Sequence, residues 1–393
     1  MSLWAFDDAA CRRLAERHGT PLFAYDEATA EAGFRRLRTA LPQRVRLAYA
    51  VKANPHHALL RCFAELGASF DCASIGELRR VSELGLSPGR TLFAGPGKRA
   101  EELRLAMELG VRVQAESWED LARLEAMADG ELAVNLRVHP LEAGEEATRI
   151  LGGAGPSAFG VDEEQVPELL ARAASLQRVR IRGLHVFAAS NQRDSAKLLA
   201  THASVLRLAH RLHNVFGLEL EQIDLGGGLG VPYAPDEAPL DQDAFGLGLQ
   251  ALLTEHSWFQ GELILEPGRF LAAPCGVYLA RVIRIKDSRG VRFAILEGGV
   301  NHLLRPLLTG QPFPVRVVGR TGALSPFTLA GPLCTSLDRL GEVALPELEP
   351  GDLLAFGMTG AYGFTEGMTH FLSHPVPPEV WVDQPSSEES GSS

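Results

Sequence analysis

Short apolar runs alternate with amphipathic segments between residues 44 and 265, and this alternation restricts the fold more than any other feature of the sequence. Eight runs have the length of β-strands, at residues 45–51, 69–72, 91–94, 112–114, 132–138, 179–187, 220–225 and 262–265. Segments with helical periodicity lie between them, for example at residues 75–84, 100–109, 118–128, 163–174 and 195–215. Strands that alternate with helices in this number favour an α/β fold of the (β/α)8 barrel type, and an open doubly wound sheet is the second possibility.

The pattern changes after residue 269, where strand-like runs are separated by turns instead of helices. These runs are at residues 277–285, 292–296, 315–318, 327–330 and 353–356, and they predict an antiparallel β domain. A helix is predicted over residues 6–19, and a strand over 21–25 that we expect to join the β domain. The predicted parts are an N-terminal segment (1–27), a barrel (28–268), a C-terminal β domain (269–383) and a disordered low-complexity tail (384–393).

The charge and the cysteine content exclude several classes of function. A net charge of −11 without a basic run argues against nucleic acid and anionic membranes as partners. Five cysteines, an odd number without metal-type spacing, predict no metal site and indicate a reducing compartment. The N-terminal residues do not resemble a secretory signal, and no stretch is apolar enough to cross a bilayer, so we expect a cytoplasmic protein.

Lys52 ends the first of the predicted barrel strands. Ala48, Ala50 and Lys52 share one face of this strand, which leaves space beside the amine, while bulky apolar side chains occupy the other face. The chain contains only four lysines, at positions 52, 98, 197 and 286, and its other cationic side chains are arginines. A lysine in an apolar strand of such a chain suggests amine chemistry, because desolvation lowers the pKa of an ammonium group and makes it a usable nucleophile. A strand-end lysine that reaches solvent is the alternative from this strand alone.

A glycine-rich turn follows the seventh predicted strand. Gly226, Gly227 and Gly228 expose backbone N–H groups without Cβ atoms in the way, so this turn can hold a phosphate group. A dinucleotide-binding turn needs a helix directly after the glycines, but Val231-Pro232-Tyr233-Ala234-Pro235 cannot begin one. The sequence therefore favours a phosphate site over an NAD site, and a tight turn without a ligand is the remaining alternative.

The eighth predicted strand runs into Glu266-Pro267-Gly268-Arg269. A carboxylate that follows Ile264-Leu265 is expected to point inward and to be paired, and Arg269 has the donor geometry that suits a phosphate group. An exposed Glu–Arg pair is the simpler alternative.

These three motifs, with Tyr49-Ala50-Val51-Lys52-Ala53-Asn54 as the first, resemble those of the fold-type III pyridoxal-phosphate decarboxylases, the relatives of diaminopimelate, ornithine and arginine decarboxylase. The resemblance runs from residue 21 to residue 371, with the motifs in the family's order. It implies an alanine-racemase-like barrel with a C-terminal β domain, and pyridoxal 5'-phosphate as the cofactor. It also implies that Lys52 binds the cofactor aldehyde, that the three glycines, Gly268 and Arg269 surround the phosphate, and that Glu266 faces the pyridine nitrogen.

Four further residues follow from the same resemblance. Asp71 matches a carboxylate near the cofactor lysine, and Arg137 matches an arginine near the cofactor ring. Cys334, in Gly331-Pro332-Leu333-Cys334-Thr335-Ser336-Leu337-Asp338, matches a cysteine that reaches the partner subunit's active site and protonates the substrate carbon after CO2 leaves. Tyr362 matches a tyrosine that hydrogen-bonds the phosphate. The resemblance thus implies a homodimer with shared active sites. From the residues alone, Asp71 could be a helix cap, Arg137 a salt-bridged side chain, Cys334 a packed cysteine and Tyr362 a hydroxyl at a turn.

The departures from the family pattern concern the cofactor ring and the substrate. Phe187 stands where the family has a stacking histidine, and its ring can also stack, while Ser190 is retained as a phosphate donor. Thr335 replaces an acid that reads a distal ammonium group, and Arg305 matches the position where diaminopimelate decarboxylases hold the distal carboxylate. Because Arg305 is retained and Thr335 replaces the acid, the sequence favours a substrate with a distal carboxylate or acyl group. This pattern resembles the branch that acts on siderophore intermediates or on amino acids attached to carrier proteins.

The sequence thus predicts a pyridoxal-phosphate-dependent α-decarboxylase of an amino acid or amino-acid conjugate. Lys52 and Cys334 are the predicted catalytic residues, and Arg305, Thr335 and Arg269 are the predicted substrate-binding residues. A racemase on the same fold is one alternative, although the Cys334 signature argues against it. A non-catalytic regulator is disfavoured because the lysine and the phosphate turn are both retained. An NAD-linked oxidoreductase requires a helix directly after the glycine turn.

Overall fold

The computed structural model describes residues 2–141 and 155–383. The chain divides into two compact units, one formed by Phe34–Val231 and Pro239–Gly268, the other by Met1–Gly33, Pro232–Ala238 and Arg269–Ser393. The predicted disordered tail, 384–393, lies outside the described residues.

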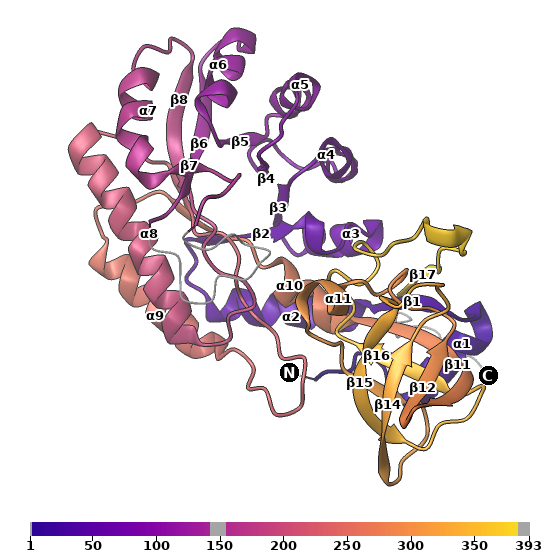
Figure 1. Cartoon of the computed structure of the whole chain (residues 1–393). Coiled ribbons are helices and arrows are strands. Elements are labelled where there is room, and N and C mark those ends of the chain that lie inside the picture. The colour runs from indigo at the N-terminus through magenta and orange to yellow at the C-terminus, as the bar shows by residue number, and fades with distance from the viewer. Residues whose placement is uncertain (1, 142–154, 384–393) are drawn as a thin grey trace, which may run out of the picture. The chain divides into compact units, whose positions relative to one another are not determined.

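The first unit contains a closed barrel of eight parallel strands (Figure 1). The barrel strands are β2 (Val45–Ala50), β3 (Ser69–Cys72), β4 (Thr91–Phe93), β5 (Arg112–Ala115), β6 (Leu132–His139), β8 (Val179–His185), β9 (Gln222–Asp224) and β10 (Glu262–Leu265). Each strand pairs in parallel with its neighbours, and pairing of β5 with β6 and of β10 with β2 closes the circle. A short additional strand, β7 (Val161–Asp162), pairs with β6 outside this circle. The predicted (β/α)8 barrel is therefore confirmed, and the doubly wound sheet was the wrong alternative.

Helices alternate with the barrel strands, beginning with α2 before β2, and lie on the outside of the barrel in Figure 1. They are α2 (Glu27–Ala40), α3 (His57–Glu65), α4 (Ile75–Ser82), α5 (Ala100–Glu108), α6 (Trp118–Met127), α7 (Val166–Ala173), α8 (Ser195–Phe216) and α9 (Gln242–Glu255). Several begin at side-chain caps, because the oxygens of Ser74, Ser117, Asp194 and Asp241 accept hydrogen bonds from N–H groups of the first turn. After the glycine turn the next described helix is α9, so no helix opens at the glycines and the NAD alternative lacks its required element.

Part of the barrel interior is polar, whereas branched aliphatic side chains dominate most (β/α)8 cores. The Gln114 amide on β5 donates a 3.0 Å hydrogen bond to Asp224 on β9, and these two strands are not neighbours, so the bond crosses the interior. Asn135 on β6 reaches Gln222 on β9 in the same way, at 3.3 Å. Gly183 on the intervening strand leaves room for this contact, since a Cβ atom there would lie 2.0 Å from the Asn135 oxygen.

The second unit is built on a mixed sheet. Its strands are β1 (Leu22–Asp26), β11 (Gly276–Ser288), β12 (Val291–Leu296), β13 (Val315–Val317), β14 (Leu324–Ala330), β15 (Arg339–Pro346), β16 (Leu353–Gly357) and β17 (Glu379–Val382). The N-terminal strand β1 pairs antiparallel with β11 of this sheet. Most pairings are antiparallel as predicted, but β12–β14 and β1–β17 are parallel, and β15 and β17 were not predicted.

Short helices accompany this sheet. The predicted helix over 6–19 is α1 (Asp8–His18), which begins at the Asp7 cap, and the others are α10 (Gly268–Ala272) and α11 (Arg305–Thr309). Cys11 and Ala15 of α1 pack into a core with Leu22, Val277 and Leu353. No helix in the described part of the chain combines the length and apolarity that a bilayer crossing requires.

Candidate active site

Lys52 lies at the carboxyl end of β2, in a single 3-10 turn (Val51–Ala53) and not in the strand as predicted, because the strand already ends at Ala50. Its Nζ is 3.9 Å from Oδ2 of Asp71 and 4.9 Å from the centre of the Phe187 ring. The side chain is 41% exposed. The protein itself therefore shields the amine from water less than a position in an apolar strand suggested. The 3-10 turn lies close to the segment after β10 because Gly268 has no side chain. A Cβ atom on Gly268 would lie 2.9 Å from the Cβ atom of Ala50.

The glycine turn follows β9 and lies between the segments that follow β8 and β10. Gly226 and Gly228 have φ values of +69° and +106°, a region that side chains with Cβ atoms rarely adopt. A Cβ on Gly227 would lie 2.7 Å from the carbonyl oxygen of Glu266 and 3.1 Å from the Phe187 ring. The turn therefore lies directly beside both of these predicted site residues.

Backbone hydrogen bonds fix this arrangement. Glu266 N donates to Gly226 O at 2.9 Å, and Gln192 N donates to Gly228 O at 2.8 Å. Ser190 belongs to the segment that the second bond ties to the turn. The amine, the glycine turn and the Glu266 corner thus gather at the carboxyl ends of the barrel strands, where (β/α)8 enzymes carry their active sites.

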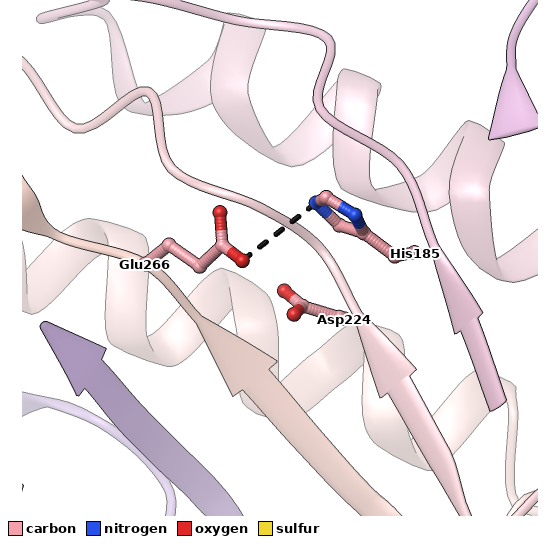
Figure 2. A group of neighbouring side chains, drawn as sticks. All are labelled: His185, Asp224 and Glu266. Carbon is pink, nitrogen blue, oxygen red and sulfur yellow. Dashed lines mark ion pairs between the residues drawn. The ribbon is translucent and has the colours of Figure 1, made fainter. Parts of the chain in front are cut away.

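Three buried side chains meet beneath the glycine turn: His185 at the end of β8, Asp224 at the end of β9 and Glu266 just after β10 (Figure 2). Their polar atoms lie within 4.8 Å of one another. Asp224 accepts hydrogen bonds from Gly226 N at 2.9 Å and from Gln114 at 3.0 Å. Nε2 of His185 is 3.7 Å from Oε1 of Glu266, which is longer than a hydrogen bond.

Burial controls the protonation of this cluster. It raises the pKa of Glu266 and of Asp71 well above the ordinary carboxyl range, and nearby carboxylates add to both shifts. Burial also raises the pKa of Asp224 to about 7. The pKa of His185 lies well below its ordinary value, because burial and the charges of Arg137 and Lys52 disfavour the protonated ring. The His185 ring is thus mainly neutral at pH 7, and the contact marked in Figure 2 does not involve a charged imidazole.

The cluster contains buried polar atoms without a hydrogen-bonding partner among the described residues. They include Oε1 of Glu266 and both ring nitrogens of His185, each residue being at most 3% exposed. A protonated pyridine nitrogen at Glu266 would satisfy that oxygen, and the adjacent glycine turn and amine suit a phosphate and an aldehyde. The three side chains are also of types that bind divalent cations. Pyridoxal phosphate accounts for the amine and the turn as well, so the residues present fit this cofactor.

Arg137 on β6 is salt-bridged, which was the alternative to a direct role at the cofactor. Its guanidinium lies 3.1 Å from Glu116 and 4.9 Å from the centre of the Phe159 ring. Glu116 also accepts hydrogen bonds from Gly95 N at 2.6 Å and from Gly160 N at 3.0 Å. This one carboxylate, just after β5, therefore joins β6 to the segment that follows β4 and to the segment that precedes β7.

The second unit contains the remaining predicted cationic residues in one group. Arg269 is 8% exposed; its Nη1 donates to the Tyr233 hydroxyl at 3.0 Å, and its guanidinium lies 4.8 Å from the centre of the Tyr362 ring. Arg305 lies 4.4 Å from the centre of the same ring and donates to both carboxylate oxygens of Glu366, at 2.8 and 3.0 Å. Arg305 was predicted to be available for a substrate carboxylate, and the structure instead pairs it within its own unit.

Cys334 and Thr335 lie in a loop that Asp338 holds in place. Asp338 is 3% exposed and accepts hydrogen bonds from Val300 N at 2.8 Å and from Leu333 N at 2.7 Å. Cys334 is exposed, whereas the other four cysteines are buried. This exposure suits a thiol that acts on a molecule outside its own loop.

Sequence reasoning missed four residues that the structure places against predicted ones. Asp224 and Glu116 each stand at the carboxyl end of a barrel strand, as Glu266 does, and this position could have singled them out. Tyr233 and Glu366 lie outside helices and strands, and no local pattern connects them with Arg269 and Arg305.

Comparison with known proteins agrees with this site. The sequence profile described as "Pyridoxal-dependent decarboxylase, pyridoxal binding domain" matches residues 27–273. The diaminopimelate decarboxylase of Methanothermobacter thermautotrophicus is 35% identical over 379 residues, which are 94% of this chain and 88% of that protein. The L-glutamyl-(BtrI acyl-carrier protein) decarboxylase of Niallia circulans is 32% identical over 391 residues, 95% of this chain and 91% of that protein.

A solved structure is similar over nearly the whole chain. The crystal structure of diaminopimelate decarboxylase from Helicobacter pylori complexed with L-lysine has a TM-score of 0.87 at 28% identity and covers 95% of this chain and 94% of that one. The barrel, the mixed sheet, the lysine beside the glycine turn and these matches together have one explanation. The chain belongs to the fold-type III pyridoxal-phosphate-dependent decarboxylases and is a carboxy-lyase of that family.

Proposed function

We propose that this decarboxylase removes the α-carboxyl group of an amino acid whose distal end is a carboxyl-derived acyl group, such as an amide or a thioester. The proposal places it in the branch that acts on siderophore intermediates or on amino acids attached to carrier proteins. The observation that carries the proposal is the ion pair of Arg305 with Glu366.

This pair removes the free charge that a distal carboxylate would need. Arg305 is 7% exposed, and Glu366 already occupies its Nη1 with two hydrogen bonds, so a substrate carboxylate would have to displace a carboxylate of the protein. Thr335 carries no charge, so a distal ammonium group also lacks a partner there. A neutral acyl group requires neither a free cation nor a free anion.

The relatives support this choice without deciding it. Identities of 35% to a diaminopimelate decarboxylase and 32% to a decarboxylase of a carrier-bound glutamyl group are too similar to separate the two substrate classes. The second relative is named for a glutamyl group on an acyl-carrier protein, and a carrier-bound amino acid is one of the substrates proposed for this chain.

The other residues keep the roles that the family match implies. Pyridoxal phosphate, when bound, accepts the electron pair that remains on the α-carbon as CO2 leaves. In our proposal Lys52 bonds to its aldehyde, Glu266 holds a proton at its ring nitrogen and Phe187 covers its ring. Cys334 of the partner subunit then donates its thiol proton to the α-carbon.

A panel of substrates tests the proposal by CO2 release. The panel contains the pantetheine γ-thioester of glutamate, glutamine, glutamate, diaminopimelate, ornithine and lysine. We expect kcat/KM for the thioester to exceed that for diaminopimelate at least about tenfold. Highest turnover of diaminopimelate, ornithine or lysine would contradict the proposal.

A variant separates charge from shape at the same position. Glu366→Gln frees the Arg305 charge while the size of the side chain is kept. We expect it to improve kcat/KM for free glutamate relative to the thioester, because the arginine can then pair with the distal carboxylate. An unchanged ratio would show that Arg305 does not read the distal group.

Two further features are part of the proposal. The chain acts as a homodimer, since the exposed Cys334 is expected to complete the site of a second copy. None of the five cysteines, all within the described residues, forms a disulfide, which supports a reducing, cytoplasmic location.

A further inference from the structure

We propose that Asp224 is a positioning residue that holds Glu266 and stabilises positive charge at the ring nitrogen of the cofactor, from one layer deeper in the barrel. The proposal rests on the cofactor and not on the substrate proposed above. It therefore stands or falls separately from the thioester experiment.

The orientation of Asp224 is fixed by two donors. The residue is fully buried at the end of β9. Its Oδ1 accepts from Gly226 N at 2.9 Å, and its Oδ2 accepts from the Gln114 amide at 3.0 Å. The first bond ties the carboxylate to the phosphate turn, and the second anchors it across the barrel interior. Both oxygens are thus held before any ligand binds.

Asp224 is also close to Glu266. In the strand register it lies beside Ile264, two residues before Glu266. The two carboxyl groups have polar atoms within 4.8 Å of each other, and burial raises the pKa of both. Figure 2 shows Asp224 between the strands that carry the other two residues.

This pair has a consequence for charge. Two buried carboxyl groups this close together cannot both be charged without a large cost, so the pair favours holding a proton. The pair can give that proton to a ring nitrogen placed at Glu266, after which both carboxylates flank one positive charge. The barrel then holds a protonated ring without taking a proton from solvent.

Other charged groups face Asp224 and bear on its protonation. Asp71 on β3 raises the cost of its negative charge, while Glu266 just after β10 and Arg46 on β2 lower it, and His185 on β8 lies in the same cluster. Burial outweighs these interactions and raises the pKa of Asp224 to about 7.

A comparison of cofactor affinities tests the proposal directly. The variants are Asp224→Asn, which removes the charge at constant size, and Gln222→Met as the control. Gln222 lies on the same strand and inner face, two residues earlier, and donates to Glu262. The probes are pyridoxal phosphate and an analogue in which CH replaces the ring nitrogen.

We expect the wild type and the control to bind pyridoxal phosphate more tightly than the analogue. Asp224→Asn should reduce this preference about tenfold, which corresponds to one pKa unit at the ring nitrogen. It should also lower kcat about tenfold while KM changes little, because the carboxylate does not contact the substrate. An unchanged preference in Asp224→Asn would overturn the proposal.

The cofactor-free protein supplies a second readout. A carboxyl group whose folded pKa is raised contributes stability below its unfolded pKa and loses it as pH rises through the folded value. Wild-type apoprotein should therefore lose stability between about pH 4 and pH 7, and Asp224→Asn should lose less. Equal pH slopes for the two proteins would contradict the proposal.

A variant outside the cluster covers the case in which Asp224→Asn does not fold. Gln114→Met removes the donor to Oδ2 and leaves the carboxylate in place. We expect the same loss of preference for pyridoxal phosphate over the analogue, but a smaller one. A Gln114→Met protein with the full wild-type preference would count against the positioning role.

Discussion

Lys52 differs from the other lysines in what surrounds its amine. Lys98 is 4% exposed and is paired with Asp120, and Lys286 is exposed on β11. Lys52 instead combines partial exposure with a carboxylate at 3.9 Å and an aromatic face at 4.9 Å. An amine that must exchange one bonding partner for another needs this access, which a fully buried lysine lacks.

Replacement of Lys52 should remove both the covalent attachment of the cofactor and catalysis. We expect Lys52→Ala to lack the absorbance band of lysine-bound pyridoxal phosphate and to lose more than about 10³-fold in kcat. Lys286→Ala, at an exposed lysine of the other unit, is the control and should keep both. Absorbance after reconstitution and CO2 release measure the two effects, and a Lys52→Ala protein with the wild-type band would exclude Lys52 as the attachment point.

At the scale of elements, the glycine turn after β9 depends on close approach and not only on flexibility. Gly227 has no positive φ, yet a Cβ there would meet the Glu266 carbonyl at 2.7 Å. The obstacle is backbone, which cannot rotate away as a side chain can. The turn therefore requires glycine at this position because β10 passes directly beside it.

Gly227→Ala should accordingly destabilise the barrel mouth. We expect a loss of about 1–3 kcal/mol in the free energy of unfolding, together with weaker binding of pyridoxal phosphate. Gly130→Ala is the matched control, because nothing lies within 4 Å of a Cβ there and its φ is not positive. Urea denaturation and cofactor titration test this, and equal behaviour of the two variants would show that the turn can move aside.

Helix α8 carries a second element-scale feature, a buried histidine. His202 is fully buried against Phe245 of α9, with ring centres 5.6 Å apart, and within the described chain neither ring nitrogen has a hydrogen-bonding partner. Burial lowers its pKa to about 4. The folded protein favours the neutral ring, so His202 contributes its full share of stability when the pH is above the pKa of the unfolded state. This contribution is lost as the pH falls toward 4.

Replacing this histidine should protect the protein against acid. We expect His202→Leu to lose less stability than the wild type between about pH 6.5 and pH 4, by a few kcal/mol at most. Thermal unfolding at a series of pH values gives the comparison, and His210→Leu at a partly exposed position of the same helix is the control. Parallel curves for His202→Leu and wild type would show that His202 does not titrate in this range.

At the scale of the whole molecule, local patterns predicted the barrel strands and most of the sheet. They failed for β15, whose residues alternate between buried and exposed with charged side chains, and for the half-exposed edge strand β17. At the site they placed Lys52, Glu266 and the glycines, because strand ends and turns are local features. They could not place the Gln114–Asp224 bond or the Arg305–Glu366 pair, which join residues 110 and 61 positions apart.

The proposed dimer can be tested with two inactive proteins. If Cys334 completes the site of its partner, Lys52→Ala and Cys334→Ala remove residues from opposite sides of each shared site. A mixed dimer then contains one site with both residues intact and one with neither. We expect activity to recover on mixing, to about a quarter of the wild-type value when subunits exchange at random.

The mixing experiment has a control that uses the same loop. Leu337→Ala, at an exposed position in the Cys334 loop, should remain active alone and should gain nothing when mixed with Lys52→Ala. Subunit exchange is followed independently by differently tagged chains. Exchange without recovery would place Cys334 in the site of its own chain, and the thiol would then have to reach the barrel mouth from within one subunit, so each copy could work alone.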